Sequence, residues 1–280
     1  MHNETFYTKK EIPEIKIALL SDIHYYEGYN NKIFERLLSQ IKRNNPNYIT
    51  IAGDILDSSH ITNFDSLKNF LINLANIAPT LVVIGNHDEK AGYMHNWTYN
   101  KNNSLLELLK SINNLYFLND SIKHFDNITF YGFNFSFEYY EKDNETYESF
   151  CKEIKKLNSD LPNNTYNITL FHSPINIYNF LRENKKHFLN KSDLILSGHM
   201  HNGCLPFILS YPINKLFKTS RGLLSPTRKF FPKYAHGRIS ERDGYVFEGI
   251  CKLSHSTKAL HKFDIFFQKK VEFITIKKDR

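Results

Sequence analysis

Cysteine is scarce in this chain of 280 residues, which has three scattered cysteines: Cys151, Cys204 and Cys251. An odd number of cysteines without a CxxC pair excludes a disulfide framework and a cysteine-based zinc site as organising features. A reducing compartment is therefore expected.

Long apolar segments are missing as well. No uncharged apolar run approaches the ~20 residues that a membrane-spanning helix needs. Residues 1–13 are polar and lack the apolar core of a signal peptide. The sequence thus predicts a cytoplasmic protein, and it leaves open peripheral attachment to the inner face of a membrane.

Acidic residues are absent between Leu194 and Ser240, although the chain has 29 of them and a formal net charge of +7. A block of this kind favours an anionic partner, either an anionic phosphoester substrate with apolar character or an anionic membrane surface. The alternative is a solvated basic face that binds nothing. No base-reading module accompanies the block, so sequence-specific binding of nucleic acid is not expected. The basic residues, which alternate with aromatic ones, are Lys215, Lys218, Arg221, Arg228, Lys229, Lys233 and Arg238.

The remaining composition is typical of a globular protein, with 41% hydrophobic and 23% charged residues. The length suits a single domain over residues 1–280. Within it we expect a metal-ligand core at 14–203, a basic and aromatic segment facing substrate or membrane at 204–240, and closing strands at 241–280. The sequence does not predict the oligomeric state.

Polar side chains follow three apolar segments at equal spacing. Asp22 and Asp54 are 32 residues apart, and so are Asp54 and Asn86, with His24 and His87 close by. This spacing is about the length of a strand–helix–strand unit. Because the carboxyl ends of parallel strands meet at one edge of a sheet, these side chains are expected to lie together. The corresponding predictions are strands at 15–20, 48–52 and 81–84 and helices at 33–41 and 66–76.

Histidines mark two later strand ends. A strand at 167–171 ends at His172, just before Pro174, and a strand at 193–197 leads into His199 and His201. An HxH pair alone is weak evidence for a metal site, and the preceding strand ends strengthen it. The other predicted elements are a surface loop at 91–103, strands of a second half at 115–118 and 128–135, helices at 104–112, 144–157 and 175–181, and closing antiparallel strands at 245–253 and 263–276.

Carboxylates, imidazoles and one amide suit Mn, Fe, Zn or Co better than Mg or Ca, which prefer all-oxygen ligands. Eight such groups exceed the needs of one ion, so two divalent ions are expected, with manganese favoured. Two ions need a shared ligand, and the carboxylate of Asp54 is the natural bridge. Asp57 and Asp88 are candidates for orienting imidazoles, although Asp57 suits a helix cap equally well. The eight groups are Asp22, His24, Asp54, Asn86, His87, His172, His199 and His201.

Five blocks of the sequence resemble the signature of calcineurin-like metallophosphoesterases, most closely that of the small bacterial YkuE/YaeI-like branch. The resemblance implies an α/β fold, a four-layer α/β/β/α sandwich of mixed sheets flanked by helices. It also implies that Asn86 belongs to the second metal and that His87 stays unligated and faces the leaving group. The blocks are Asp22-x-His24, Gly53-Asp54, Gly85-Asn86-His87-Asp88, His172 and Gly198-His199-x-His201. The implied ligands are Asp22, His24, Asp54 and His201 for the first metal, and Asp54, Asn86, His172 and His199 for the second.

The expected function is hydrolysis of a phosphoester or pyrophosphate by a metal-bridging hydroxide. Asp54 would bridge the ions, Asn86 would neutralise phosphoryl charge, and His87 would donate a proton to the leaving oxygen. The basic block suggests a lipid-linked or other anionic substrate. One alternative is a cyclic-nucleotide or nucleic-acid phosphodiesterase. The other is a non-catalytic scaffold of the same fold, whose hallmark would be a missing ligand.

Overall fold

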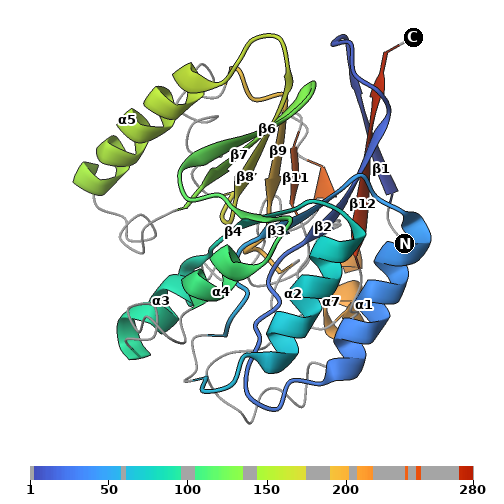
Figure 1. Ribbon diagram of the computed structural model, residues 1–280, viewed down its shortest axis with the longest axis vertical. Coiled ribbons are helices and arrows are strands. Elements are labelled where there is room, and N and C mark those ends of the chain that lie inside the picture. The colour runs from blue at the N-terminus through green and yellow to red at the C-terminus, as the bar shows by residue number, and fades with distance from the viewer. Residues whose placement is uncertain are drawn as a thin grey trace.

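Two six-stranded sheets face each other in the computed structural model (Figure 1). The structure describes residues 3–57, 61–95, 105–134, 144–174, 190–201, 207–216, 237–238, 244–246 and 271–279. The first sheet has the order β1-β12-β2-β3-β4-β5 and the second the order β10-β11-β9-β8-β7-β6. Both sheets are mixed, which agrees with the predicted α/β class.

The first sheet confirms the prediction made from the equal spacing of the strand ends. Its strands β2, β3, β4 and β5 are parallel neighbours, with Leu20 opposite Ile51 and Ala52 opposite Val83. The residues that follow β2, β3 and β4 therefore lie at one edge. The strands are β1 (Asn3–Thr8), β12 (Glu272–Lys278), β2 (Ile15–Leu20), β3 (Tyr48–Ala52), β4 (Thr80–Val83) and β5 (Leu115–Phe117).

The second sheet repeats this arrangement with three parallel strands. β7 pairs with β8, and β8 pairs with β9, so that Phe133 lies opposite Phe171 and Leu170 opposite Leu196. The strands are β10 (Gly237–Arg238), β11 (Gly244–Val246), β9 (Leu194–Ser197), β8 (Tyr166–Phe171), β7 (Ile128–Phe133) and β6 (Ser121–Phe125).

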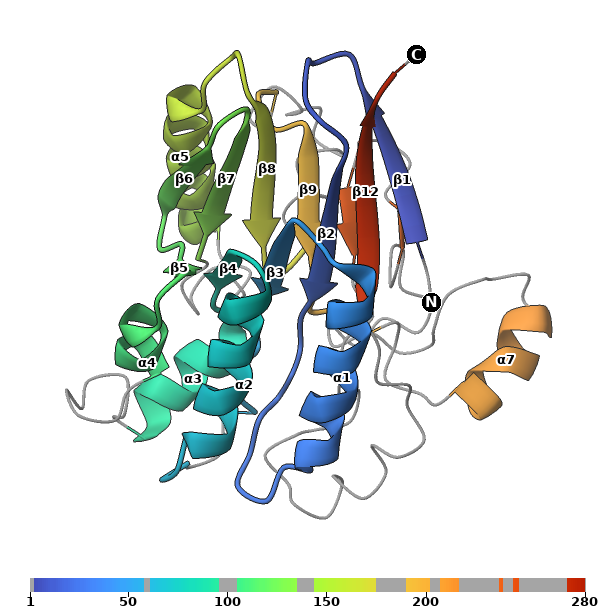
Figure 2. The ribbon, with the colours of Figure 1, turned by 45° about the vertical axis from the view of Figure 1, so that its right-hand side comes forward.

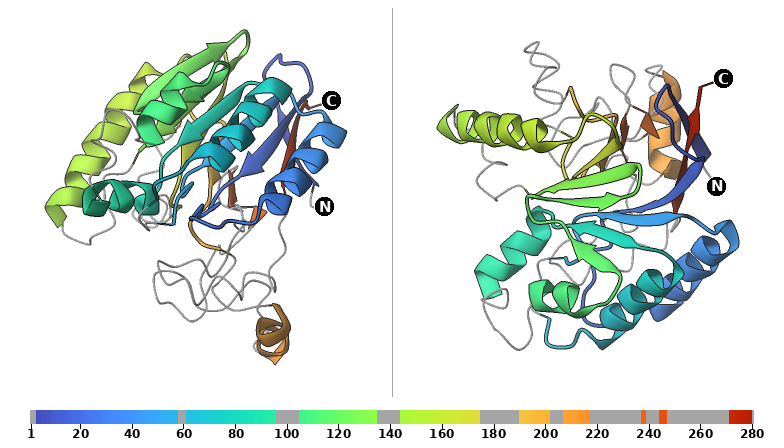
Figure 3. Two further views of the ribbon diagram at one scale, coloured as in Figure 1. Left: turned by 60° about the horizontal axis from the view of Figure 1, so that its bottom comes forward. Right: turned by 45° about the horizontal axis from the view of Figure 1, so that its top comes forward.

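Helices cover the outer faces of both sheets, which completes the predicted four layers. Figure 3 shows α1, α2 and α4 outside the first sheet and α5 outside the second. In α2, which corresponds to the predicted helix at 66–76, the apolar residues Leu67, Phe70, Leu71 and Leu74 are buried. Among the described residues, no helix is both long and apolar enough to cross a bilayer. The helices are α1 (Asn31–Asn44), α2 (Asp65–Ile77), α3 (Asn86–His95), α4 (Leu105–Ser111), α5 (Asn144–Asp160) and α7 (Phe207–Leu216).

Several local predictions are wrong. The loop expected at 91–103 begins as helix, because α3 continues to His95. The strand expected at 115–118 belongs to the first sheet, where β5 pairs with β4, and not to a second half. The closing strands are only partly antiparallel: β12 is antiparallel to β2 but parallel to β1, and β11 is parallel to β9. β1 and β6 were not predicted.

Some predictions fall on residues outside the described ranges. These are the helix at 175–181, residues 96–103 of the expected loop, residues 247–253 and 263–270 of the expected closing strands and, apart from α7 and β10, the segment at 204–240. The division of the chain at 203 and 240 stays a prediction.

Candidate metal centre

Polar side chains follow the carboxyl ends of parallel strands in both sheets. Figure 2 shows that β2, β3 and β8 point toward the same end of the molecule. Crevices at the carboxyl ends of such strands are the usual binding positions of α/β folds. The side chains predicted from these strand ends form two groups there.

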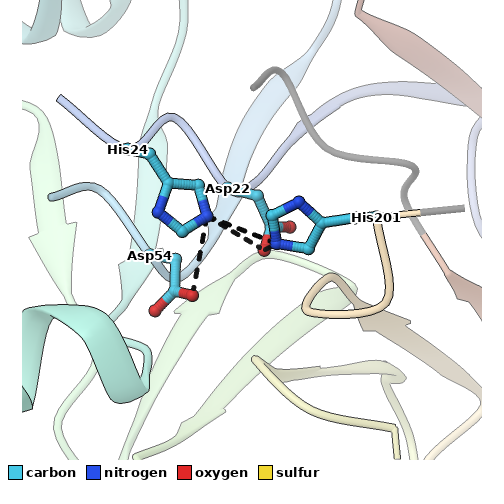
Figure 4. A group of neighbouring side chains, drawn as sticks. All are labelled: Asp22, His24, Asp54 and His201. Atoms are coloured by element: carbon cyan, nitrogen blue, oxygen red, sulfur yellow. Dashed lines mark hydrogen bonds and ion pairs between the residues drawn. The ribbon is translucent and has the colours of Figure 1, made fainter. Parts of the chain in front are cut away.

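The first group contains four buried residues, shown in Figure 4: Asp22, His24, Asp54 and His201. Their candidate ligand atoms all lie within 4.8 Å of one another. His201 Nε2 lies 3.1 Å from Asp22 Oδ1, and His24 Nε2 lies 3.8 Å from Asp54 Oδ2. The two Nε2 atoms are 3.3 Å apart. Two carboxylates and two imidazoles at these distances suit a divalent cation.

The second group shares Asp54 with the first and adds His172 and His199. His172 Nε2 lies 3.0 Å from Asp54 Oδ2 and 3.3 Å from His199 Nδ1. On the other side of the ring, His172 Nδ1 donates to the carbonyl oxygen of Ala52 at 2.7 Å. That bond fixes the ring so that Nε2 faces Asp54, as in many proteins that hold an imidazole ligand.

Asn86, at the start of α3, brings an amide oxygen to the same edge. Its Oδ1 is buried and accepts no hydrogen bond from the residues that the structure describes. Leaving a buried acceptor unpaired costs ~1–3 kcal/mol, and a bound cation would remove that cost. The residues present therefore fit the divalent ions expected from the sequence. The assignment of each residue as a ligand stays a prediction.

The electrostatics of the site couple Asp54 to His172. Burial alone raises the pKa of Asp54, but His172 and His87 outweigh it and hold this pKa well below its ordinary value. Burial lowers the pKa of His172, yet Asp54 raises it to about 9. His172 is therefore protonated at neutral pH without a metal, and it must lose that proton to bind one.

The other imidazoles with shifted pKa values are neutral. Burial, reinforced by His87, lowers the pKa of His24 well below its usual value. Burial, reinforced by His172, lowers the pKa of His199 to about 3. Neutral imidazole is the form that binds metals, so these two side chains are ready to act as ligands.

The backbone is strained where these side chains emerge. A positive φ in a residue other than glycine costs roughly 1–2 kcal/mol, and such residues concentrate at functional sites. Here the strain accompanies most of the predicted ligands. Those with φ between 49° and 68° are Asp22, His24, Asp54, His199 and His201.

Two carboxylates hold the loops after β3 and β4 together. Asp54 Oδ1 accepts a hydrogen bond from the backbone N–H of His87 at 2.8 Å. In return, Asp88 accepts bonds from the N–H groups of Ile55 at 3.1 Å, Leu56 at 2.8 Å and Gly85 at 2.9 Å. Asp88 thus fixes the backbone of both loops. Among the described residues these bonds all come from the backbone and none from an imidazole, so the expectation that Asp88 orients an imidazole stays a prediction.

His87 lies beside the first group. Its ring stands edge-on to that of His24, with 4.7 Å between the ring centroids. His87 Nδ1 donates to the carbonyl oxygen of Asp57 at 3.2 Å. Asp57 thus orients an imidazole, through its backbone carbonyl.

Sequence reasoning missed Asn134, which follows β7 as His172 follows β8. Its Oδ1 accepts a hydrogen bond from the N–H of Ile84 at 2.9 Å, and its Nδ2 donates to the carbonyl oxygen of Leu118 at 2.9 Å. Asn134 therefore holds the end of β4, two residues before Asn86. The strand-end rule used for His172 would have found it.

Comparisons with known proteins agree with this geometry. A model of the family described as calcineurin-like phosphoesterase matches residues 15–203. A metallophosphoesterase of Helicobacter pylori is 26% identical over 230 residues, which are 80% of this chain and 55% of that protein. One from Campylobacter jejuni is 25% identical over 221 residues, which are 76% of this chain and 51% of that protein. This chain spans about half the length of these curated relatives.

Two further similarities cover less or are more distant. Phosphodiesterase YaeI of Escherichia coli is 29% identical over 110 residues, which are 39% of this chain and 38% of that protein. The crystal structure of a dimetal phosphatase from Danio rerio has a TM-score of 0.42 and 13% identity, over 67% of this chain and 82% of that one. On the family match over residues 15–203, the chain belongs to the calcineurin-like phosphoesterase family.

Proposed function

We propose that this protein hydrolyses a phosphoester or pyrophosphate bond with two divalent metal ions, manganese being the first to test. One observation carries the proposal: two buried ligand groups share the carboxylate of Asp54. A shared carboxylate is what a pair of ions in one site requires. When bound, the ions would supply Lewis-acid charge and a hydroxide nucleophile at neutral pH.

Side chains of the chain would hold the two ions and stabilise the phosphoryl group. Asp22, His24 and His201 would hold one ion, and His172 and His199 the other. Asn86 would add its amide oxygen and direct its N–H₂ donors at the phosphoryl group, where negative charge develops.

His87 would protonate the leaving oxygen. Its Nδ1 donates to the Asp57 carbonyl, so the other ring nitrogen, Nε2, would hold and deliver the proton. The edge-on contact with His24 keeps the ring beside the first ligand group.

The substrate class is proposed on narrower support. The relative named phosphodiesterase YaeI makes a diester the first choice. The acid-free basic segment after His201 suits an anionic substrate and keeps a lipid-linked phosphate or pyrophosphate as the second choice.

Metal-depleted protein, reloaded separately with Mn, Fe, Zn or Co, should be assayed on a monoester, a diester and a lipid pyrophosphate. We expect turnover only in loaded protein, with two ions per chain by elemental analysis. Full turnover in the metal-depleted protein, or one ion per active chain, would refute the dinuclear proposal.

A further inference from the structure

Asn134 joins the two sheets beside the metal centre. It follows β7 of the second sheet and is largely buried. Its Oδ1 accepts a hydrogen bond at 2.9 Å from the N–H of Ile84, which follows β4 of the first sheet (Figure 2). Its Nδ2 donates to the carbonyl oxygen of Leu118, which follows β5, at 2.9 Å. One amide group of the second sheet thus holds the ends of two neighbouring strands of the first sheet.

The backbone around Asn134 reinforces this junction. The N–H of Asn134 donates to Asp120 Oδ1 at 3.0 Å, and Asp120 belongs to the connection between β5 and β6. Two residues before Asn134, a Cβ at Gly132 would overlap Leu118 and lie 2.7 Å from Val83 Cγ1. Glycine therefore lets β7 approach the end of β4 closely. Because packing and hydrogen bonds act together here, the ends of β4 and β7 are held as one unit.

Two expected ligands of the second metal ion lie on either side of this junction. On one side, Asn86 comes two residues after Ile84. On the other side, Asn134 and His172 each follow the last paired residue of the parallel strands β7 and β8, so they are neighbours at the strand ends. Asn134 therefore connects the strand end that leads to the amide ligand with the strand end beside the imidazole ligand.

A second contact between the sheets is already assigned to the imidazole. His172 Nδ1 donates to the carbonyl oxygen of Ala52, which ties the end of β8 to the end of β3. Asn134 supplies the corresponding tie between β7 and β4. Ligands must be held within about 0.5 Å of their productive geometry by supporting contacts, and ligands from two different sheets need such contacts between the sheets.

We infer that Asn134 is a positioning residue for the second metal ion: by holding Ile84 to the second sheet, it sets Asn86 at the distance from His172 that one ion requires. The inference rests on the proposed dinuclear function, because it takes Asn86 and His172 as ligands of the same ion. The first ligand group contains no residue that follows β4, so its ion should depend much less on Asn134.

Metal titration of an Asn134 variant tests the inference. Asn134→Ala removes both side-chain hydrogen bonds. Calorimetric titration of the metal-depleted full chain with Mn²⁺ should show the second binding step weakened by about 10–100-fold, the usual effect of losing a contact that supports a ligand. The first step should stay close to that of wild type. At two ions per wild-type chain, electron paramagnetic resonance should show fewer spin-coupled manganese pairs in the variant.

Two further variants separate positioning from a general loss of stability. Asn167→Ala removes a buried amide at the amino end of β8, whose Nδ2 donates to the carbonyl oxygens of Pro162 at 2.7 Å and Lys191 at 2.8 Å. It should lower the free energy of unfolding as Asn134→Ala does, yet bind both ions like wild type. Asn134→Asp keeps an oxygen for the N–H of Ile84 and should recover most of the affinity for the second ion.

The outcomes distinguish this inference from the proposed function. Wild-type protein that binds two ions, with an Asn134→Ala protein that binds both equally tightly, would overturn the inference alone. So would equal weakening in Asn167→Ala, or an Asn134→Asp protein as weak as Asn134→Ala. Wild-type protein that binds a single ion would overturn the proposed function and this inference with it. If circular dichroism shows Asn134→Ala to be unfolded, Asn134→Ser takes its place with the same expected loss, because its shorter side chain cannot span from Ile84 to Leu118.

Discussion

Buried polar side chains lie at the amino ends of parallel strands in the second sheet and at the carboxyl ends of parallel strands in both sheets, but the two sets find their partners in different ways. At the amino ends of β7, β8 and β9 these side chains form hydrogen bonds with other groups of the protein. At the carboxyl ends, in the metal centre, several atoms have no hydrogen-bond partner among the described residues. The difference separates polar groups that hold the fold from polar groups that await a ligand.

The amino-end cluster is internally complete. Asp193 Oδ2 accepts hydrogen bonds from Lys10 Nζ at 2.6 Å and from the N–H of Asn167 at 2.7 Å. Asn167 Oδ1 accepts a bond from Thr165 at 2.8 Å, and the hydroxyls of Thr165 and Thr129 are 2.8 Å apart. A buried network that is fully paired strengthens the packing of the strands it joins.

The carboxyl-end cluster is not complete. Asn86 Oδ1 and Asp54 Oδ2 are buried without a hydrogen-bond partner in the described part of the chain, although Asp54 Oδ2 forms ion pairs with His172 and His24. Native proteins rarely leave buried polar atoms in this state, and a bound ion is one of the recognised reasons for it. Polar residues at the two ends should therefore respond differently to substitution.

Asp54→Asn should have the largest effect. It removes the shared carboxylate and leaves His172 without its ion pair, so both ions should be lost and turnover should fall by about 10⁶-fold or more. Elemental analysis and a phosphodiester assay would measure this. The matched control Asp193→Asn removes a carboxylate at the other end and should keep both ions. An Asp54→Asn protein with two ions and normal turnover would show that the carboxyl-end cluster does not depend on Asp54 to bind metal.

His87→Ala should lower turnover by about 10²–10⁴-fold, the usual contribution of a general acid, while metal content stays near two ions per chain. His124→Ala on β6 is the control, and both quantities should stay unchanged there. If His87→Ala turned over at the wild-type rate, His87 would have no part in the mechanism.

Gly85→Ala tests how tightly the loops are packed. A Cβ at Gly85 would overlap Asp54 Oδ1 and lie 2.8 Å from His172 Cδ2. Displacing these side chains should lower metal affinity by about 10–100-fold, as loss of a supporting contact does. Gly28→Ala, whose Cβ would meet nothing within 4 Å, should keep wild-type affinity even though the φ of Gly28, unlike that of Gly85, is positive. Equal affinities in both variants would show that the loops yield easily.

Metal binding should depend on pH through His172. Its pKa is raised to about 9 by Asp54, so below that pH the metal-free ring carries a proton that binding must release. Apparent affinity should rise about tenfold per pH unit up to about pH 9 and then level off. Calorimetry in buffers with different ionisation enthalpies would detect the released proton. Metal binding without proton release at pH 7 would contradict this assignment.

Much of the fold and of the carboxyl-end cluster could be predicted from the sequence. The 32-residue spacing gave the order of β2, β3 and β4 and the side chains at their ends, because local apolar runs determine these strands. β1 was missed because its polar sequence forms a strand only by pairing with β12, more than 260 residues away. β5 was assigned to the wrong half because the crossing of the chain from one sheet to the other carries no local signal.

The fine geometry of the site could not be predicted. Asp22, Asp54 and His201 have positive φ angles, which the strand-end pattern does not predict because they depend on the surrounding loops. The role of Asp88 could not be predicted either, because its carboxylate accepts hydrogen bonds from backbone N–H groups of two loops. Its neighbours in space, Ile55 and Leu56, are more than 30 residues away in sequence.

The smallest effect is expected at the amino end. Lys10→Met removes the ammonium that bonds Asp193 and the Thr165 carbonyl, and should lower the free energy of unfolding by about 1–2 kcal/mol. Urea unfolding would measure the loss, while metal content and turnover should stay unchanged. Lys278→Met is the control, since its ion pair with Glu11 is far more exposed and should contribute little. If Lys10→Met instead lowered metal content with little loss of stability, the two ends would be coupled, and the separation between structural and ligand-binding polar groups would fail.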